Sequence, residues 1–302
     1  MSLMFKTIAI VGRNDDPRVA EPMSLLAEHM SAAGVDVIAV RDIAAELPAR
    51  QVSEKTISRH AELIIAVGGD GTMLYAAGLA QSQGVPLLGV NRGRLGFLAD
   101  ITPNEMLDSV GQVLQGHYTQ ESRLLVSARI LRGTSTLSAA IALNDVVVQR
   151  KETGRMLDLR TSIAGRYVNT HSGDGLIVAT PTGSTAYALS CGGPIIDPSL
   201  DALVIVPVCP HTLSDRPIVI PAGHEVEVAL LPRADIKAEV AVDGRSIGEL
   251  TAEDRLFICK AENRITLIHP PGYDFYEILR TKLHWGRDSR FRAGLPDPDK
   301  DR

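Results

Sequence analysis

Length, composition and charge are those of an ordinary soluble globular protein. The chain has 302 residues, 45% of them hydrophobic and 22% charged, and at roughly 150 residues per domain it has room for about two domains. A net charge of -5 gives no general affinity for nucleic acid, which comes from neutralising backbone phosphates. One Trp, six Tyr and five Phe are too few for a stacking platform. Three scattered Cys without a CxxC pair predict neither a disulfide framework nor a thiolate metal site.

The apolar stretches are short. None approaches the roughly 20 residues that a transmembrane helix needs. Ile8 to Val11 is also shorter than the apolar core of a signal peptide, which needs at least about 7 residues. We therefore expect a cytoplasmic protein with no membrane and no nucleic-acid partner.

The first hundred residues alternate apolar runs with amphipathic stretches. The pattern predicts a helix over Ala20 to Ala33, and strands over Lys6 to Val11, Val35 to Val40, Leu63 to Val67 and Pro86 to Val90. Continuous apolar strands with helices between them are typical of a parallel sheet covered on both faces. A capping box with proline at the first helical position, Thr102 to Glu105, then predicts a helix to about Gln115.

From Ser122 the pattern changes to a series of short β-branched and alternating stretches. The predicted strands are 124–131, 140–149, 157–163, 176–179, 203–208, 218–220, 226–231, 238–242, 256–260 and 265–268. Such a series is typical of an all-β domain. Helical spacing returns over Tyr273 to Trp285, which holds four of the aromatic residues. We therefore expect a discontinuous first domain, 1–119 with 272–302, and a second domain over 120–271.

Several common catalytic motifs are absent. No glycine precedes a lysine, which excludes a P-loop, and no GxGxxG follows a predicted strand. The histidines form no HExxH pair. Gly244 to Gly248 matches the GxSxG motif of serine hydrolases, but a nucleophile elbow needs a strand before it and a helix after it. Here strand-like sequence lies on both sides, so we predict a hairpin.

A glycine-rich loop with one carboxylate follows the third predicted strand. Its residues are Gly68, Gly69, Asp70, Gly71 and Thr72. Ligands bind at such strand-to-helix junctions in open α/β sheets, and the next helix N-terminus presents free N–H groups to an anion such as phosphate. Asp70 would repel phosphate unless it orients a metal or accepts a proton from an attacking hydroxyl. A tight turn with an aspartate bonded to its own backbone is the alternative.

A second polar block lies in the β-rich half. It comprises Gly173-Asp174-Gly175, a strand, Thr180 to Tyr187, and Ser190 to Pro194. Small hydroxyls and bare backbone suit ribose and phosphate oxygens, and Tyr187 can stack on a base. Loops whose hydroxyls satisfy local backbone groups are the alternative. Asn144-Asp145, inside a predicted strand, indicates a ligand contact, a bulge or a turn.

Together these motifs resemble those of the NAD kinases. The matching stretches are GGDGT at 68–72, NRGRLGFL at 91–98, ND at 144–145, GDG at 173–175, TPTGSTAYALS at 180–190, GGP at 192–194 and PHTLSDRP at 210–217. The resemblance runs from Lys6 to about Trp285. GGDGT alone also resembles diacylglycerol, sphingosine and phosphofructo-kinases, and the second block separates NAD kinases from them.

The resemblance implies transfer of the γ-phosphate of ATP to the 2′-hydroxyl of the adenosine ribose of NAD, with a divalent metal, usually Mg²⁺. It implies an N-terminal α/β domain, a C-terminal β-sandwich, and a homo-oligomer, dimer or tetramer, with the site between the domains. Asp70 would accept the proton, and the Gly68, Gly69, Gly71 and Thr72 amides would hold ATP phosphates. The NAD-binding residues would be Asp70, Gly71, Asn144, Asp145, Arg155, Ser172, Asp174, Thr185, Ala186, Tyr187, Ser190 and Arg245. No metal-ligating residue is assigned.

Two other functions remain open. A lipid or sugar kinase of the same GGDGT superfamily would use the loop for ATP and another acceptor. A non-catalytic regulator would bind the dinucleotide without turnover. Production of NADP from NAD and ATP distinguishes both from an NAD kinase.

Overall fold

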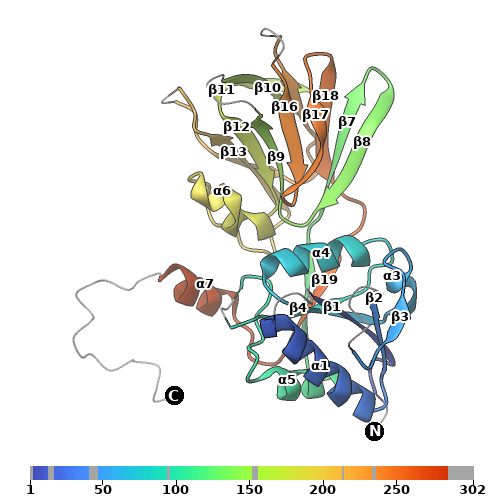
Figure 1. Cartoon of the computed structure of the whole chain (residues 1–302). Helices are drawn as coiled ribbons and strands as arrows, with labels where there is room; N and C mark the ends of the chain where they lie inside the picture. The colour runs from blue at the N-terminus through green and yellow to red at the C-terminus, as the bar shows by residue number, and fades with distance from the viewer. Residues whose placement is uncertain are drawn as a thin grey trace, which may run out of the picture.

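The protein has two domains, one above the other in Figure 1. The structure, a computed structural model, describes residues 3–12, 17–40, 47–93, 96–151, 156–212, 214–232 and 236–284. The lower domain in Figure 1 contains the N-terminus, and the upper domain is built of strands.

The N-terminal domain has a seven-stranded sheet in the order β3-β2-β1-β4-β5-β19-β6. All neighbouring strands run parallel except β6, which runs antiparallel to β19. The elements are β1 (Thr7–Gly12), α1 (Pro17–Ala32), β2 (Asp36–Val40), β3 (Arg50–Val52), α3 (Ile57–His60), β4 (Leu63–Val67), α4 (Asp70–Ala80), β5 (Leu87–Val90), α5 (Met106–Leu114), β6 (Thr119–Arg123), β19 (Ile265–His269) and α7 (Phe275–Leu283).

Helices cover both faces of this sheet, as its apolar strands require. Every residue of β4 is buried. Side chains of α1 and α5, such as Met23 and Val110, form one core with the sheet. Met73 and Ala76 of α4 belong to a second core on the opposite face, which also contains Leu125 and Leu143 of the other domain. Helix α4 therefore lies between the sheet and the C-terminal domain (Figure 1).

The C-terminal domain is a sandwich of two six-stranded antiparallel sheets. Their orders are β11-β10-β15-β18-β7-β8 and β14-β13-β12-β9-β16-β17. The strands are β7 (Val126–Arg132), β8 (Ser135–Ala142), β9 (Asp145–Arg150), β10 (Leu157–Ile163), β11 (Arg166–Gly173), β12 (Gly175–Ala179), β13 (Ala202–Val208), β14 (Ile218–Pro221), β15 (Val226–Leu230), β16 (Ala238–Val242), β17 (Arg245–Leu250) and β18 (Asp254–Lys260). Aliphatic side chains of both sheets form one core. The predicted fold class, α/β plus β-sandwich, is confirmed.

Some strands differ from the sequence prediction. The single strand predicted over 140–149 is divided between β8 and β9, and Asn144 lies in the turn between them. β11 has no predicted counterpart, because its first three residues, Arg166 to Val168, are all exposed at a sheet edge and therefore lack the alternation that marks a half-buried strand. The hairpin predicted at Asp243-Gly244 is present between β16 and β17.

The chain passes between the domains through β6 and β19, which pair with each other in the N-terminal sheet. The predicted boundaries placed residues 120–123 of β6 and all of β19 in the second domain. We propose boundaries near Leu124 and Ile265 instead, because they follow the sheet. After β19, helix α7 lies against both domains: Lys282 is 5.6 Å from the ring centroid of Phe97, and Tyr276 donates to Asp197 at 2.9 Å. Trp285 and residues 286–302 lie outside the described residues.

Candidate active site

The GGDGT loop joins β4 to α4 at the carboxyl end of the parallel strands. Asp70 is the first residue of α4 and Gly69 is its N-cap, so the helix begins inside the GGDGT loop itself. The first N–H groups of a helix have no intrahelical acceptor. A Cβ added at Gly69 or Gly71 would meet no atom within 4 Å. The loop thus presents uncovered backbone and a helix N-terminus to open space, which suits an anion.

The Asp70 carboxylate is held by a second loop, the one after β5. The amides of Phe97 and Leu98 donate to its two oxygens, each at 3.0 Å. A Cβ on Gly96 would lie 2.1 Å from Oδ1 of Asp70, so only glycine fits there. Asp70 is half-buried, and the two amides hold its carboxylate in one orientation at the N-terminus of α4.

The Asn144-Asp145 turn is organised by Asp243, which lies on the β16–β17 turn with a positive φ of 47°. Its carboxylate accepts the amides of Leu143 and Asn144 at 2.8 Å and of Asp145 at 3.2 Å. The Asn144 side-chain oxygen is buried, and no donor reaches it among the residues that the structure describes. Burial, with the nearby charge of Asp243, raises the pKa of Asp145 to about 7. A buried carboxyl with such a pKa is typical of a functional site.

The TPTGST stretch follows β12 as a short 3₁₀ helix, η1 (Thr182–Thr185), and then α6 (Tyr187–Ser190). Thr180 donates to the carbonyl of Leu143 at 2.6 Å. Ser184 accepts from the amide of Ile196 at 2.9 Å, and Thr185 donates to the carbonyl of Thr182 at 3.2 Å. These hydroxyls therefore bond to local backbone groups and hold the loop in shape, as the alternative interpretation of this polar block predicts. Ser190 is exposed and Ala186 half-buried, both at the surface of α6.

Tyr187 stands at the start of α6 with 43% of its surface exposed. Burial of the phenol, followed by the neighbouring thiol of Cys191, raises its pKa, and Asp174 contributes in the same direction. A partly exposed aromatic ring is suited to stacking on a flat base.

The Gly173-Asp174-Gly175 turn lies at the end of β12 opposite to Thr180. A Cβ at Gly175 would lie 2.2 Å from the carbonyl oxygen of Val148, and one at Gly173 would lie 2.8 Å from the His171 ring. Between them, Asp174 is 3.2 Å from Arg150, and Ser172 donates to Asp158 at 2.5 Å. The five residues of β12 separate the two ends by roughly 16 Å. Ser172 therefore lies far from the Asp70 side of this chain.

A cavity of about 440 Å³ lies between the domains. Gly71 and Tyr75 line it on the α4 side, and Asp243 and Arg245 line it on the side of the sandwich. The Arg245 guanidinium is 5.1 Å from the centroid of the Tyr75 ring. The structure thus brings the β16–β17 turn next to the glycine loop, from residues about 170 positions apart.

Of the site residues chosen from sequence, Gly71 and Arg245 line this cavity. The amides of Asn144 and Asp145 donate to Asp243, which also lines it. Arg155 lies outside the described residues. Sequence reasoning did not single out Gly96 and Asp243, which shape the loops. The available signals were the second glycine of NRGRLGFL, which is Gly96, and the Asp243-Gly244 pair, which favours a hairpin turn.

Neither a metal-binding cluster nor a membrane-spanning helix occurs in the described ranges. No three His, Cys, Asp or Glu side chains there lie close enough together to hold a metal ion. Among the same residues, no helix combines the length and the hydropathy of a membrane span.

Comparison with known proteins assigns the family. A sequence model of the ATP-NAD kinase N-terminal domain matches residues 8–118, and one of the ATP-NAD kinase C-terminal domain matches residues 143–270. The NAD kinase of Methylococcus capsulatus is 43% identical over 94% of this chain and 99% of its own, and that of Pseudomonas paraeruginosa is 43% identical over 96% and 99%.

Solved structures have the same fold. Yeast NADH kinase complexed with NADH superposes with a TM-score of 0.88 at 24% identity, covering 96% of this chain and 90% of that one. An NAD kinase from Archaeoglobus fulgidus in complex with ATP gives 0.69 at 24% identity, covering 92% and 97%. With both family domains matched and relatives above 40% identity over nearly the whole length, the chain belongs to the NAD kinase family.

Proposed function

We propose that the protein transfers the γ-phosphate of ATP to the 2′-hydroxyl of the adenosine ribose of NAD, which makes NADP. The observation that carries the proposal is the placement of Asp70. Its carboxylate is fixed by two amides at the N-terminus of α4, and the next residue, Gly71, lines a cavity between the domains. A proton acceptor next to an anion site is what phosphoryl transfer to a hydroxyl requires.

Each side of the cavity has a role in this proposal. The amides of the Gly68–Thr72 loop bind the ATP phosphates, and Asp70 accepts the proton of the ribose hydroxyl. Arg245 lines the cavity with Gly71, so its guanidinium can reach either the transferred phosphate or the NAD pyrophosphate. Phosphoryl transfer depends on positioning and charge neutralisation, and these groups supply both.

The C-terminal domain binds the dinucleotide. We assign the base to the exposed face of Tyr187 and an exocyclic amine or ribose hydroxyl to Asp174. The unpartnered oxygen of Asn144 and the buried carboxyl of Asp145 suit ribose hydroxyls, since each needs a polar partner when buried. Thr185, Ala186 and Ser190 supply the wall of the pocket. Arg155 and Ser172 are assigned to NAD from the motif alone.

A divalent metal, most simply Mg²⁺, would accompany the donor. The described residues hold no cluster of three metal-ligating side chains, so they fit a metal carried largely by the phosphates of ATP, as Mg²⁺ usually is. The metal would neutralise charge that develops on the transferred phosphoryl group.

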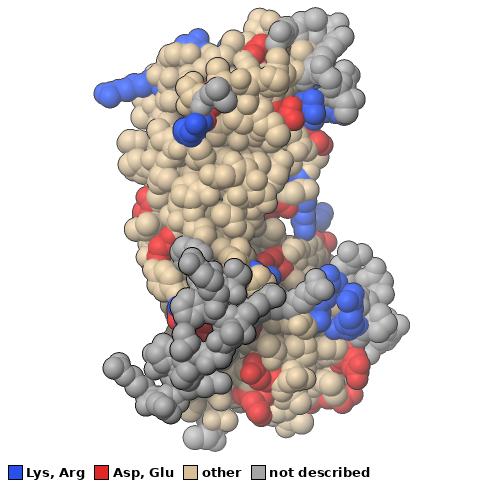
Figure 2. All heavy atoms as spheres, turned by 90° about the vertical axis from the view of Figure 1, so that its left-hand side faces the viewer, with Lys and Arg blue, Asp and Glu red and all other residues tan. Residues whose placement is uncertain are grey.

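We also propose a cytoplasmic homo-oligomer. The distance between Ser172 and the Asp70 side of the chain supports an arrangement in which a second copy completes the pocket. The face that carries α7 shows basic and acidic side chains in small separate groups (Figure 2). This mixed charge, with the net charge of -5, supports the expectation of no nucleic-acid partner.

Incubation of the purified protein with NAD, ATP and Mg²⁺, followed by an assay for NADP, tests the function. We expect NADP to form at a rate proportional to the enzyme concentration. Absence of NADP with every nucleotide and polyphosphate donor would overturn the proposal. Phosphorylation of diacylglycerol or a sugar phosphate instead would favour a related kinase, and NAD binding without turnover would favour a regulator.

A further inference from the structure

A chain of four charged side chains in the N-terminal domain reaches its junction with the C-terminal domain. Asp100 is 2.8 Å from Nδ1 of His269, and Nε2 of His269 is 3.5 Å from Glu121, which pairs with Arg123. Arg123 and His269 are almost fully buried, with exposed fractions of 2% and 1%. Burial opposes the charged form of His269, but hydrogen bonds and charge from Asp100 and Glu121 outweigh it and raise its pKa. Negative and positive groups therefore alternate along the chain.

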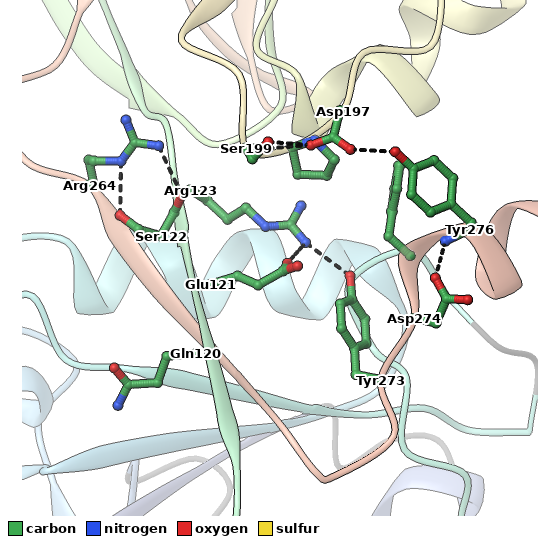
Figure 3. A pocket seen from close by; sticks show the side chains of 12 residues that line it. Gln120, Glu121, Ser122, Arg123, Asp197, Ser199, Arg264, Tyr273, Asp274 and Tyr276 are labelled. Carbon is green, nitrogen blue, oxygen red and sulfur yellow. Dashed lines mark hydrogen bonds and ion pairs between the residues drawn. The ribbon is translucent and has the colours of Figure 1, made fainter.

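Arg123 is the end of this chain that reaches the C-terminal domain. It is the last residue of β6, in the N-terminal sheet. Its guanidinium donates to the hydroxyl of Tyr273 at 3.2 Å and to that of Thr182 at 3.3 Å. Figure 3 shows the guanidinium between Glu121 and Tyr273 at one side of a cavity of about 530 Å³. Thr182 is the first residue of η1, five positions before Tyr187.

The other end of the chain reaches the loop of the proton acceptor. Asp100 follows Leu98, whose amide donates to Asp70, by two residues. The turn from Gly96 to Ala99, which contains Leu98, is closed by a hydrogen bond of 3.0 Å from the Gly96 amide to the Ala99 carbonyl, and Asp100 follows this turn directly. The connected groups thus run from the loop that fixes Asp70 to the loop that leads to Tyr187.

Stability alone does not explain such a chain. Charges removed from water lose hydration energy that their mutual attraction only partly restores, and apolar replacements are often as stable. The Nε atom of Arg123 is buried with no acceptor in the described part of the chain, which adds a cost. A forked guanidinium fixes the geometry of the groups that it bonds. Here it fixes β6 relative to η1 and to the ring of Tyr273, and that ring stacks on His269 with 3.6 Å between the ring centroids.

We propose that Arg123 is a positioning residue, which fixes η1 relative to the Asp70 loop through its bond to Thr182 and so sets the distance between bound NAD and the proton acceptor. The inference rests on the proposed function. NAD would still bind to the C-terminal domain without this bond, but its ribose hydroxyl would no longer be held at the right distance from Asp70. Small misplacements of reacting groups cost up to about 100-fold in rate.

Thr182→Val is the cleanest test, because it removes the hydroxyl, keeps the shape and leaves the buried charges in place. We expect kcat to fall about 10-fold or more, with the Kd for NAD, measured by calorimetry, changed less than about 3-fold. Arg123→Lys, which loses the forked guanidinium, should likewise lower kcat and leave the Kd for NAD nearly unchanged. The double variant should be no slower than the slower single variant, because both remove one interaction.

Arg132→Lys and Thr251→Val are the matched controls, since Arg132 donates to Thr251 at 3.5 Å in the sandwich, away from the site. Both should keep the kcat of the unmodified protein. A kcat of Thr182→Val equal to that of the controls would overturn the proposal even if its Tm fell. Additive losses in the double variant would also overturn it, because they would mean that Thr182 acts directly on the substrate. If Arg123→Lys does not fold, the kcat of Thr182→Val alone tests the proposal. An unmodified protein that makes no NADP is a failure of the proposed function, which the same assay distinguishes.

Discussion

Glycines in the two halves of the site have opposite surroundings. In the N-terminal half, Gly69 and Gly71 face open space, with no atom within 4 Å of an added Cβ. In the C-terminal half, Gly183 and Gly175 are pressed against backbone, and an added Cβ would lie 2.1 Å and 2.2 Å from carbonyl oxygens of Asn144 and Val148. The N-terminus of α4 keeps its backbone uncovered, whereas Gly183 and Gly175 let the loops of the sandwich pack closely, as Gly96 does beside Asp70 in the N-terminal half. The first half is thus suited to chemistry and the second to holding a substrate in a set shape.

Removal of the Asp70 charge should have the largest effect, and it should act on chemistry only. We expect Asp70→Asn to lower kcat by about 1,000-fold, within the range of general-base contributions, with NAD binding retained. Rate measurements and NAD titrations check both parts. The exposed Asp108 lies on α5, on the other face of the sheet, so Asp108→Asn is the control. A near-normal kcat in Asp70→Asn would remove Asp70 from its role as proton acceptor.

Alanine at the two kinds of glycine should affect different properties. Gly183→Ala forces a clash with the Asn144 backbone, and we expect it to lower the free energy of unfolding by about 3 kcal/mol. Gly71→Ala should leave that free energy unchanged or raise it by up to about 1 kcal/mol, because alanine favours a helix. It should instead lower kcat/KM for ATP about 10-fold. Urea unfolding and kinetics measure the two. Equal losses of stability would remove the distinction between the halves.

Asp145 tests whether the C-terminal half of the site contains a buried carboxyl with a raised pKa. Its pKa of about 7 in the folded protein is above the unfolded value of about 3.9. The protonated group therefore favours folding at low pH, and this contribution is lost progressively as the pH rises from about 4 to about 7. Asp145→Asn does not ionise. We expect its free energy of unfolding, relative to the unmodified protein, to rise by about 2 kcal/mol between pH 5 and 8. Urea unfolding at both pH values checks this, and a pH-independent difference would contradict the raised pKa.

Tyr187 should show the smallest effect, confined to binding. Loss of a stacking ring costs about 1 to 3 kcal/mol per base, so Tyr187→Ala should raise the KM for NAD about 10-fold with kcat little changed. Tyr167, which is 56% exposed on β11, provides the control Tyr167→Ala. An unchanged KM would exclude stacking on Tyr187.

The sequence predicted the architecture and the motif loops because both depend on local patterns. Apolar strands, the Gly-Asp-Gly-Thr turn and the Asp-Gly hairpin are visible in consecutive residues. The roles of Gly96, Asp243 and Arg123 are not, because each is defined by a contact with a distant loop. Gly96 approaches Asp70 and Arg123 approaches Thr182 only after the chain has folded. β11 was missed for a different reason, since exposed edge strands carry little periodic signal.

The position of β19 also constrains how the protein is made. β19 lies between β5 and β6 in the sheet, although nearly all of the sandwich precedes it in the chain. During synthesis, the N-terminal sheet therefore remains incomplete until residues 265–269 leave the ribosome, with β5 as an open edge and β6 without its neighbour. We expect the sandwich to fold first, and the sheet to close around the last strand only near the end of translation. A fragment that stops before Ile265 would lack the strand that joins its two parts, so the two domains are not separable by truncation.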